Sequence, residues 1–514
     1  MKYSSDQSLI TRLTDKLKVA LGRKYLDWAE SLPEFKGGVI ASLQHARRFQ
    51  RKEAEKSLER SHLPTGLSIR YSLCAQMELF PLESVDDLDS AIKGLFPKSW
   101  PEHDSREFIR SAARGLHEGD WCNVGVLVRE SRYAFGPPVA MVESLPPEVE
   151  YISVQVYKVL SSSFVAYFCA FLNDRATSGL GELLSATYLP AIRFRRWVPS
   201  GPLAGGYTQT PADRVRENAL QTELLRIRTS IENVIGRYFQ GYFFRERGGE
   251  IPKLPAIEAF DLLGVPRKGE ELSWGWGAPL GLGNGTVTFD GYARDKQIFI
   301  FSNTGRSGLP VAHRLIMLHD TPEDSTARDQ RLWLLADELI ATIAQGLTLL
   351  EMLRQIRRAA EALRMRIYRR LAENPWLMGF RGDIRLHRRL QKESLLLNRL
   401  ALELEQSEKI QWRGPADLAS FHALYKKRKE RDLDKDLCDR IDFQLDTTSK
   451  HIEFVSKCFS DYVATRNMDL TFRLQIQVYV LAALAFLATI LPPMVEYWPS
   501  IRAAFHRLLN LFGS

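Results

Sequence analysis

The sequence predicts an α+β cytoplasmic head, followed by an all-α, coiled-coil-like helical region and a single C-terminal transmembrane helix. Three observations predict this order. Apolar and polar residues alternate with the period of β-strands only between about residues 66 and 320. From Ser325 onward, apolar residues recur at spacings of three and four, which is the helical pattern. Finally, no charged residue occurs between Leu474 and Val495.

Residues 1–62 are predicted to form N-terminal helices. The first residues carry no apolar stretch of the kind found in a signal peptide, so we expect the bulk of the chain in the cytoplasm. The basic residues Arg47, Arg48, Arg51 and Lys52 are followed closely by three glutamates. This mixture of signs favours a solvated helix over a nucleic-acid site.

The head is expected to span residues 63–320. Ser84 to Asp87 resembles a capping box that opens a helix over residues 86–95. Residues 150–172 are predicted to form two long paired strands with a break near residues 161–163. The other predicted elements are strands at residues 67–73, 121–128, 286–289 and 297–302, a helix from about residue 210 to 242, and a buried element at residues 311–319.

No local motif in the head points to catalysis, so no catalytic, cofactor-binding or metal-ligating residue is predicted. Residues 275–285 are rich in glycine but lack the lysine and serine or threonine of a phosphate-binding loop. His313 and His319 are six residues apart, which is not the spacing of a helical metal pair. The five cysteines are scattered and indicate reduced thiols in a cytosolic compartment. An enzyme whose site assembles from distant residues stays open as an alternative.

Residues 325–430 are predicted to form an antiparallel helical hairpin. A breaker at residues 373–382 separates two helices and reverses the chain. The first helix carries an apolar seam of coiled-coil type, made of Leu332, Leu335, Leu339, Ile343, Gly346, Leu350, Leu353, Ile356, Ala360, Leu363, Ile367 and Leu371.

Residues 432–473 are predicted to form a stalk helix that continues into a transmembrane helix over residues 474–495. The length of the predicted transmembrane helix is close to the roughly 20 apolar residues that cross a bilayer. The polar side chains of the segment are Gln475, Gln477 and Thr489, and the pair Pro492–Pro493 is expected to end the helix. The residues expected to face lipid are Leu474, Val478, Leu481, Leu484, Phe486 and Leu491.

Two stretches are predicted to touch the membrane surface. Residues 497–514 have an apolar face and form an interfacial helix, with Trp498 and Arg502 at the headgroups. The hairpin tip is expected at the same surface if the hairpin packs along the stalk, with contacts from Arg369, Arg370, Trp376, Phe380 and Arg381. The alternatives are a solvated basic tip, or one paired with acidic residues of a second subunit.

The order of parts resembles the CorA-type magnesium channel family, in which a stalk helix also runs into a membrane span. Residues 461–471, just before the span, are similar to that family's asparagine-rich approach to the membrane. The resemblance implies similar mounting and a homo-oligomer around the stalk. The family's Gly-Met-Asn signature is absent, and no second apolar stretch of spanning length follows Pro492. We therefore carry over no selectivity residue and no magnesium transport.

These patterns predict a membrane-anchored, self-associating protein whose head senses or binds a cytoplasmic protein partner; a bacterial conflict or defence effector is one form of it. The expected partners are membrane lipid, further copies of the chain and that partner, with no cofactor. One alternative is a CorA-like ion-conducting oligomer lined by Gln475, Gln477 and Thr489, although the two glutamines point about 200° apart on a helix. The other is a tethered enzyme without a recognisable motif.

Overall fold

The computed structural model describes residues 28, 31–33, 44–45, 47–48, 51–52, 68–96, 105–114, 121–130, 138–160, 162–186, 188, 191–194, 207–210, 212–246, 254–264, 287–293, 296–302, 312–319, 325–372, 380–406, 417–423 and 432–512. Most of the predicted N-terminal helical region lies outside this set. The chain divides into two compact units. The first comprises Met1–Gln355 and Arg399–Leu445, and the second comprises Ile356–Asn398 and Asp446–Ser514.

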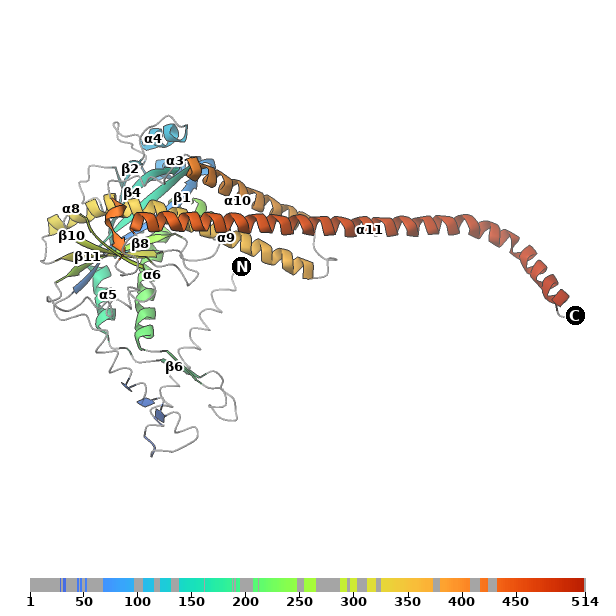
Figure 1. Cartoon of the computed structure of the whole chain (residues 1–514), viewed down its shortest axis with the longest axis horizontal. Coiled ribbons are helices and arrows are strands. Elements are labelled where there is room, and N and C mark those ends of the chain that lie inside the picture. Colours follow the sequence, from blue (N-terminus) through green and yellow to red (C-terminus); the bar gives the residue numbers. More distant parts are fainter. Residues whose placement is uncertain are drawn as a thin grey trace. The chain divides into compact units, whose positions relative to one another are not determined.

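The first unit is built on a mixed sheet of ten strands, in the order β12-β9-β10-β11-β8-β1-β5-β4-β2-β3 (Figure 1). Neighbouring strands are antiparallel except for the pairs β8 with β11 and β2 with β3. The predicted α+β class is therefore confirmed. The strands are β1 (Ser68–Pro81), β2 (Trp121–Val128), β3 (Val139–Met141), β4 (Val149–Leu160), β5 (Ser163–Leu172), β8 (Ala256–Leu263), β9 (Val287–Ala293), β10 (Lys296–Ser302), β11 (Ala312–His319) and β12 (His422–Ala423).

The predicted pair of long strands is the hairpin of β4 and β5, which lies between β1 and β2 in the sheet. Every residue of β5 is buried, because helices cover both faces of the sheet at this point. A strand buried on two faces has no polar side, which is why this stretch reads as a continuous apolar run. The hairpin of β9 and β10 and the buried strand β11 also lie where the sequence predicted them.

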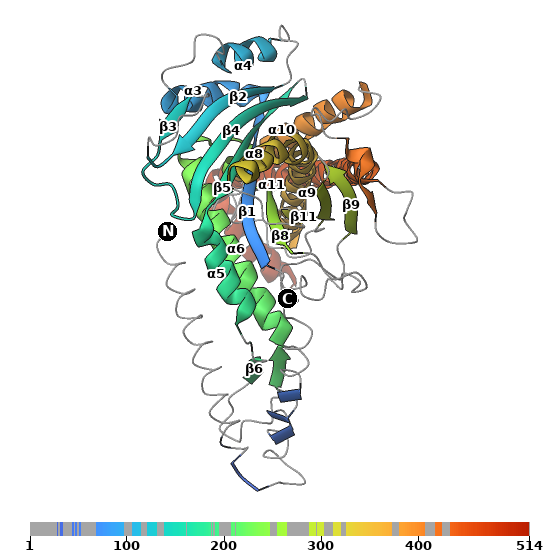
Figure 2. The ribbon, with the colours of Figure 1, turned by 90° about the vertical axis from the view of Figure 1, so that its left-hand side faces the viewer.

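Helices pack on both faces of the sheet (Figure 2). On one face, Gln76 of β1 donates from Nε2 to the carbonyl of Arg228, on α6, at 2.8 Å. On the other face, the Tyr167 hydroxyl donates to the carbonyl of Ala336 at 3.0 Å. The first face carries α3 (Val85–Leu95), α5 (Asp174–Ser185), α6 (Ala212–Tyr238) and α7 (Tyr242–Glu246), and the second carries α8 (Ser325–Leu335) and the π-helical turn η4 (Ala336–Ile340). The remaining small elements are α4 (Ser105–Ala113), the 3₁₀ turns η1 (Leu82–Ser84) and η6 (Leu418–Ser420), and the strand pair β6 (Ala191–Phe194) and β7 (Tyr207–Thr210).

Helix α3 begins where the sequence predicted, but the predicted capping box does not form. The Ser84 side chain makes no capping hydrogen bond to the helix. Its hydroxyl instead donates to the carbonyl of Pro81 at 3.0 Å, because Ser84 is the last residue of the turn η1 and its side chain points back along the chain. Asp87 pairs with Arg245 rather than with the helix terminus.

Three long helices follow the sheet: α9 (Ala341–Ala372), α10 (Phe380–Gln406) and α11 (Leu433–Phe512). Every residue of α9 from Ala341 to Leu353 is buried, on all sides of the helix. A coiled-coil helix would bury one seam only. This part of α9 therefore belongs to the core of the first unit, although its apolar pattern resembled that of a separate hairpin.

Helix α11 continues through Pro492 and Pro493 to Phe512, so the prediction that the proline pair ends it was wrong. A proline removes one donor and clashes with the preceding turn, which can bend a helix without ending it. Figure 1 shows the last part of α11 turned away from the axis of the rest. The predicted interfacial stretch is thus a bent continuation of the same helix.

A close approach of two backbones joins α7 to β1. Glu78 of β1 is fully buried and accepts the backbone N–H groups of Phe243 at 2.8 Å and of Phe244 at 3.2 Å. Burial raises the pKa of Glu78 to about 8, although these donors favour the ionised form. Gly241 permits the approach, because an added Cβ would lie 2.4 Å from the carbonyl oxygen of Leu79.

We predict that Gly241→Ala lowers the free energy of unfolding by roughly 1 to 3 kcal/mol, the usual effect of overpacking. Gly94→Ala is the matched control, because nothing lies within 4 Å of a Cβ added there. In the helix α3 it should raise stability by up to about 1 kcal/mol. Chemical denaturation of the full chain, followed by circular dichroism, measures both. Equal effects of the two alanines would contradict the packing of α7 on β1.

Candidate functional site

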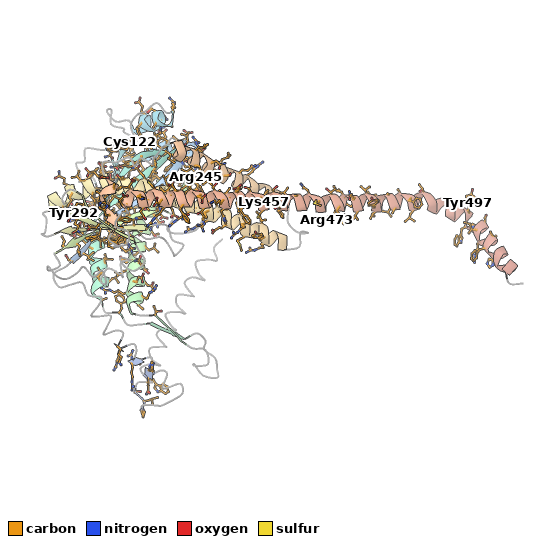
Figure 3. All side chains as sticks on the ribbon, in the orientation of Figure 1. Cys122, Arg245, Tyr292, Lys457, Arg473 and Tyr497 are labelled. Carbon is orange, nitrogen blue, oxygen red and sulfur yellow. The ribbon has the colours of Figure 1, made fainter. Side chains whose placement is uncertain are left out.

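Within the part of the chain that the structure describes, α11 carries a long exposed apolar surface. Every side chain from Leu474 to Leu487 is exposed, and these fourteen consecutive positions cover all directions around the helix. Arg473 and Tyr497 bracket the uncharged segment in Figure 3. A helix in water normally buries its apolar stripe and exposes a polar one. Five predicted span residues, Leu474, Val478, Leu481, Leu484 and Phe486, are exposed here, and the side chain of Leu491 lies outside the described set.

A second apolar helix shows the opposite behaviour. Among the described residues, Arg328–Arg369 is the helix long and apolar enough to cross a membrane, and 78% of its most apolar window is buried inside the protein. Most of its apolar side chains are thus buried in the interior of the protein. Thr471–Leu487 is a shorter apolar helix whose side chains meet no such core. Burial, rather than hydropathy, distinguishes the two.

Of the three polar side chains in the uncharged segment, that of Thr489 bonds to the helix itself. The Thr489 hydroxyl donates to the carbonyls of Phe486 at 2.8 Å and Ala485 at 3.1 Å. Such bonds to the preceding turn leave the methyl group to face outward. Gln475 and Gln477 are exposed on nearly opposite sides.

Upstream, one seam of α11 is buried, as the sequence predicted. Its buried members are Leu433, Leu437, Ile441, Thr448, Ile452, Val455 and Phe459. Within the second unit, α9 runs beside α11 in the same direction. Tyr368 places its hydroxyl 4.0 Å from the sulfur of Cys458, and a second approach lies four residues earlier on α9 and seven residues earlier on α11. There, burial and the nearby Arg364 lower the pKa of His451.

The predicted membrane-surface residues fall into two groups. Arg369 of α9 and Trp498 and Arg502 of α11 are exposed. Trp376 lies outside the described residues, as do the side chains of Arg370, Phe380 and Arg381. Contact of any of them with lipid stays a prediction.

A buried polar cluster in the first unit was not predicted. His313 of β11 is buried, and neither of its ring nitrogens has a hydrogen-bond partner in the part of the chain that the structure describes. Burial, together with Arg440 of α11 and Arg354 of α9, lowers the pKa of His313 to about 3. The sequence signalled only a histidine within a strand, which fits a core position and a ligand position equally well.

The arginines of this cluster have acidic partners on their own helices. Arg440 lies 2.6 Å from the buried carboxylate of Asp436, and Arg354 lies 4.0 Å from that of Glu351. The opposite face of β11 carries a further buried pair, Arg314 with Glu258, at 2.7 Å. No group of three or more metal-ligating side chains occurs among the described residues. We therefore interpret the cluster as a polar junction that joins the first turns of α11 to the sheet.

Comparison with known proteins adds no assignment. No protein-family model matches the chain, and no curated protein is significantly similar to it. The function must therefore be argued from the physical properties of its surfaces.

We predict that His313→Leu flattens the pH dependence of stability. The folded state binds this proton less tightly than the unfolded state, so stability falls as pH drops below about 6.5. Between pH 6.5 and 5 the wild-type chain should lose about 2 kcal/mol through this group. Denaturation midpoints at pH 7, 6 and 5 measure the difference. His422→Leu, at an exposed position, is the control and should keep the wild-type slope; an unchanged slope in His313→Leu would contradict the buried, unpaired imidazole.

Proposed function

We propose that this protein is anchored in a membrane by the segment of α11 from Leu474 to Leu491. The observation that carries the proposal is the apolar surface that surrounds α11 from Leu474 to Leu487 and is exposed at every position. Removing a large apolar side chain from water stabilises a system by roughly 1.5 to 3 kcal/mol. A surface of this kind, with no polar side to face water, is matched by lipid on all sides.

Length supports the same proposal. Eighteen residues of helix are about 27 Å long, close to the roughly 30 Å of a hydrocarbon core. Exposed Tyr497 and Trp498 follow the segment, where aromatic side chains favour the interface. The anchor is thus a single C-terminal pass, and the head is carried by the same helix.

The head, on this proposal, faces the cytoplasm and binds a protein partner there. Its cysteines support a reducing compartment, because all five in the chain are free. Burial raises the pKa of Cys74 and of Cys169 to about 12, so these two thiols are unreactive parts of the core.

We predict that Leu481→Arg combined with Leu484→Arg releases the protein from membranes. Two arginines near the centre of a span cost about 5 to 7 kcal/mol on insertion scales. Alkaline carbonate extraction of membranes from expressing cells should leave the wild-type chain in the pellet and move the double variant to the extract.

Phe443→Arg with Phe454→Arg is the matched control, because both phenylalanines are exposed on α11 outside the segment. It should stay in the membrane pellet. Complete extraction of the wild-type chain would sink the anchor proposal.

We further propose that the chain self-associates through a second face of α11. Phe454, Met468 and Phe472 are exposed and point within about 40° of one another. The buried residues Ile452, Val455 and Phe459 point about 100° to 160° away from Phe454, toward the interior of the second unit. We name Phe454, Met468 and Phe472 the outer stripe. Copies anchored in one bilayer bring their outer stripes to the same height, which favours a symmetric assembly.

We predict that Phe454→Glu with Met468→Glu reduces the assembly to monomers. Carboxylates placed in an apolar contact lose their hydration without gaining a partner. Light scattering of the detergent-solubilised full chain gives the protein mass. The wild type should be a discrete oligomer, and Met365→Glu with Leu395→Glu, at exposed apolar positions of α9 and α10, should leave that oligomer intact. A monomeric wild type, or a double variant with wild-type mass, would contradict the outer stripe.

A further inference from the structure

One half-buried carboxylate of the first unit has no cationic partner. Asp337 lies on η4, and its Oδ1 accepts a hydrogen bond from Nε2 of Gln155, on β4. Its second oxygen, Oδ2, has no partner among the residues that the structure describes. Burial raises the pKa of Asp337, the bond from Gln155 lowers it, and the neighbouring carboxylate of Glu338 raises it again. No cationic side chain contributes, although a carboxylate that loses its hydration is normally compensated by one.

A π-helical turn presents this carboxylate. Turns of this kind are rare and occur frequently at functional sites. The turn η4 is fixed from the sheet at two neighbouring residues. The Tyr167 hydroxyl donates to the carbonyl of Ala336 at 3.0 Å, and Gln155 holds the side chain of Asp337. The carboxylate is therefore held in one position over the sheet.

An exposed indole ring borders the same place. Trp121, the first residue of β2, is 49% exposed, and its ring stacks on that of Tyr157 with 6.2 Å between the centroids. The Tyr157 hydroxyl donates to Oε1 of Gln155 at 2.7 Å, which extends the hydrogen-bonded chain that ends at Asp337. Gln155 is diagonal to Trp121 in the pairing of β2 with β4, so their Cβ atoms are about 7 to 8 Å apart. The indole ring and the carboxylate thus border one small surface.

Two buried polar atoms without partners flank Gln155. Asn123 lies directly opposite Gln155, and Ser153 precedes it by two residues on the same face of β4. Oδ1 of Asn123 and Oγ of Ser153 have no hydrogen-bond partner in the described part of the chain, and Ser153 is only 3% exposed. Buried polar groups are nearly always paired. These two atoms and Oδ2 of Asp337 can all accept, so the group that is missing here is a hydrogen-bond donor.

We propose that the surface formed by Trp121, Tyr157 and Asp337 binds an arginine side chain of a protein partner. This inference rests on the proposed binding of a protein partner by the head and names the surface for it. A guanidinium group has five N–H donors and no acceptor, which complements the unpaired acceptors. It also pairs with carboxylates and stacks on aromatic rings, whereas a lysine ammonium has no plane to stack. One arginine can therefore lie on the indole ring and donate to Oδ2 of Asp337.

The test uses the detergent-solubilised full chain and a capped peptide of one arginine between two glycines. Saturation-transfer NMR, followed as a titration, gives the affinity and shows which peptide protons touch the protein. We expect contacts from the arginine side chain. A peptide with citrulline, which has nearly the same shape and no charge, should bind at least about tenfold more weakly. Asp337→Asn should weaken binding of the arginine peptide at least about tenfold, and Trp121→Leu about twofold to fivefold.

Asp290→Asn is the matched control. Asp290 of β9 is also a half-buried carboxylate in the sheet, and it accepts hydrogen bonds from Nε2 of Gln297 at 2.9 and 3.1 Å. This variant should bind the arginine peptide as the wild type does. Circular dichroism verifies that the variants fold. If Asp337→Asn misfolds, Trp121→Leu decides, because its ring is exposed.

The inference is overturned if the wild-type chain does not bind the arginine peptide, or binds the citrulline or corresponding lysine peptide equally well. Wild-type affinity in both Asp337→Asn and Trp121→Leu, or an equal loss in Asp290→Asn, would overturn it as well.

Failure of the proposed function is a separate result, measured by cross-linking in cells. If the peptide does not bind while the head cross-links to a protein through another face, the inference fails and the partner-binding proposal stands. If the peptide binds as expected while the head cross-links to no other protein, the arginine site stands and the protein partner is contradicted.

Discussion

The removal of apolar helix surface from water is the constraint on which this structure depends. Two helices have apolar side chains on more than one face, and these side chains lie in different surroundings. The first part of α9 is surrounded by the first unit, where Ala341 to Leu353 are buried on every side. The segment from Leu474 to Leu487 of α11 has no such surroundings among the described residues and must find them outside the chain. The membrane proposal follows from this contrast.

Polar groups inside the first unit show how strongly burial controls its chemistry. Glu78 accepts backbone N–H groups of α7, and yet burial raises its pKa to about 8. His313 lies near two arginines, and burial lowers its pKa to about 3. Both shifts favour the neutral form, because a charge in the interior loses its hydration. Neither group has the geometry of a catalytic pair in the described structure, and both lie where helices are fixed to the sheet.

The sequence was sufficient to predict elements whose pattern is local. The hairpin of β4 and β5, strand β11 and the buried seam of α11 lie where periodicity placed them, because each pattern reflects burial of neighbouring residues. It was insufficient where the outcome depends on distant partners. The apolar seam of α9 could not show that Ala341 to Leu353 are buried on every side of the helix. The turn η1 redirects the Ser84 hydroxyl, which no motif encodes. For the candidate membrane segment, the sequence predicted only that it is apolar. The structure adds that its side chains from Leu474 to Leu487 are exposed.

The continuity of α11 itself has a physical reason. A helix that ended inside the hydrocarbon would leave four N–H or four carbonyl groups unpaired where lipid cannot satisfy them. One helix from Leu433 to Phe512 keeps the backbone paired through the whole of the proposed span, Leu474 to Leu491. Continuity also fixes the rotation of every face relative to the others. Phe454 and Phe472 are eighteen residues apart, which is five full turns, so the outer stripe keeps a constant angle to the buried seam up to the proposed span. The length of the stalk and the direction of its faces are therefore set by one regular element.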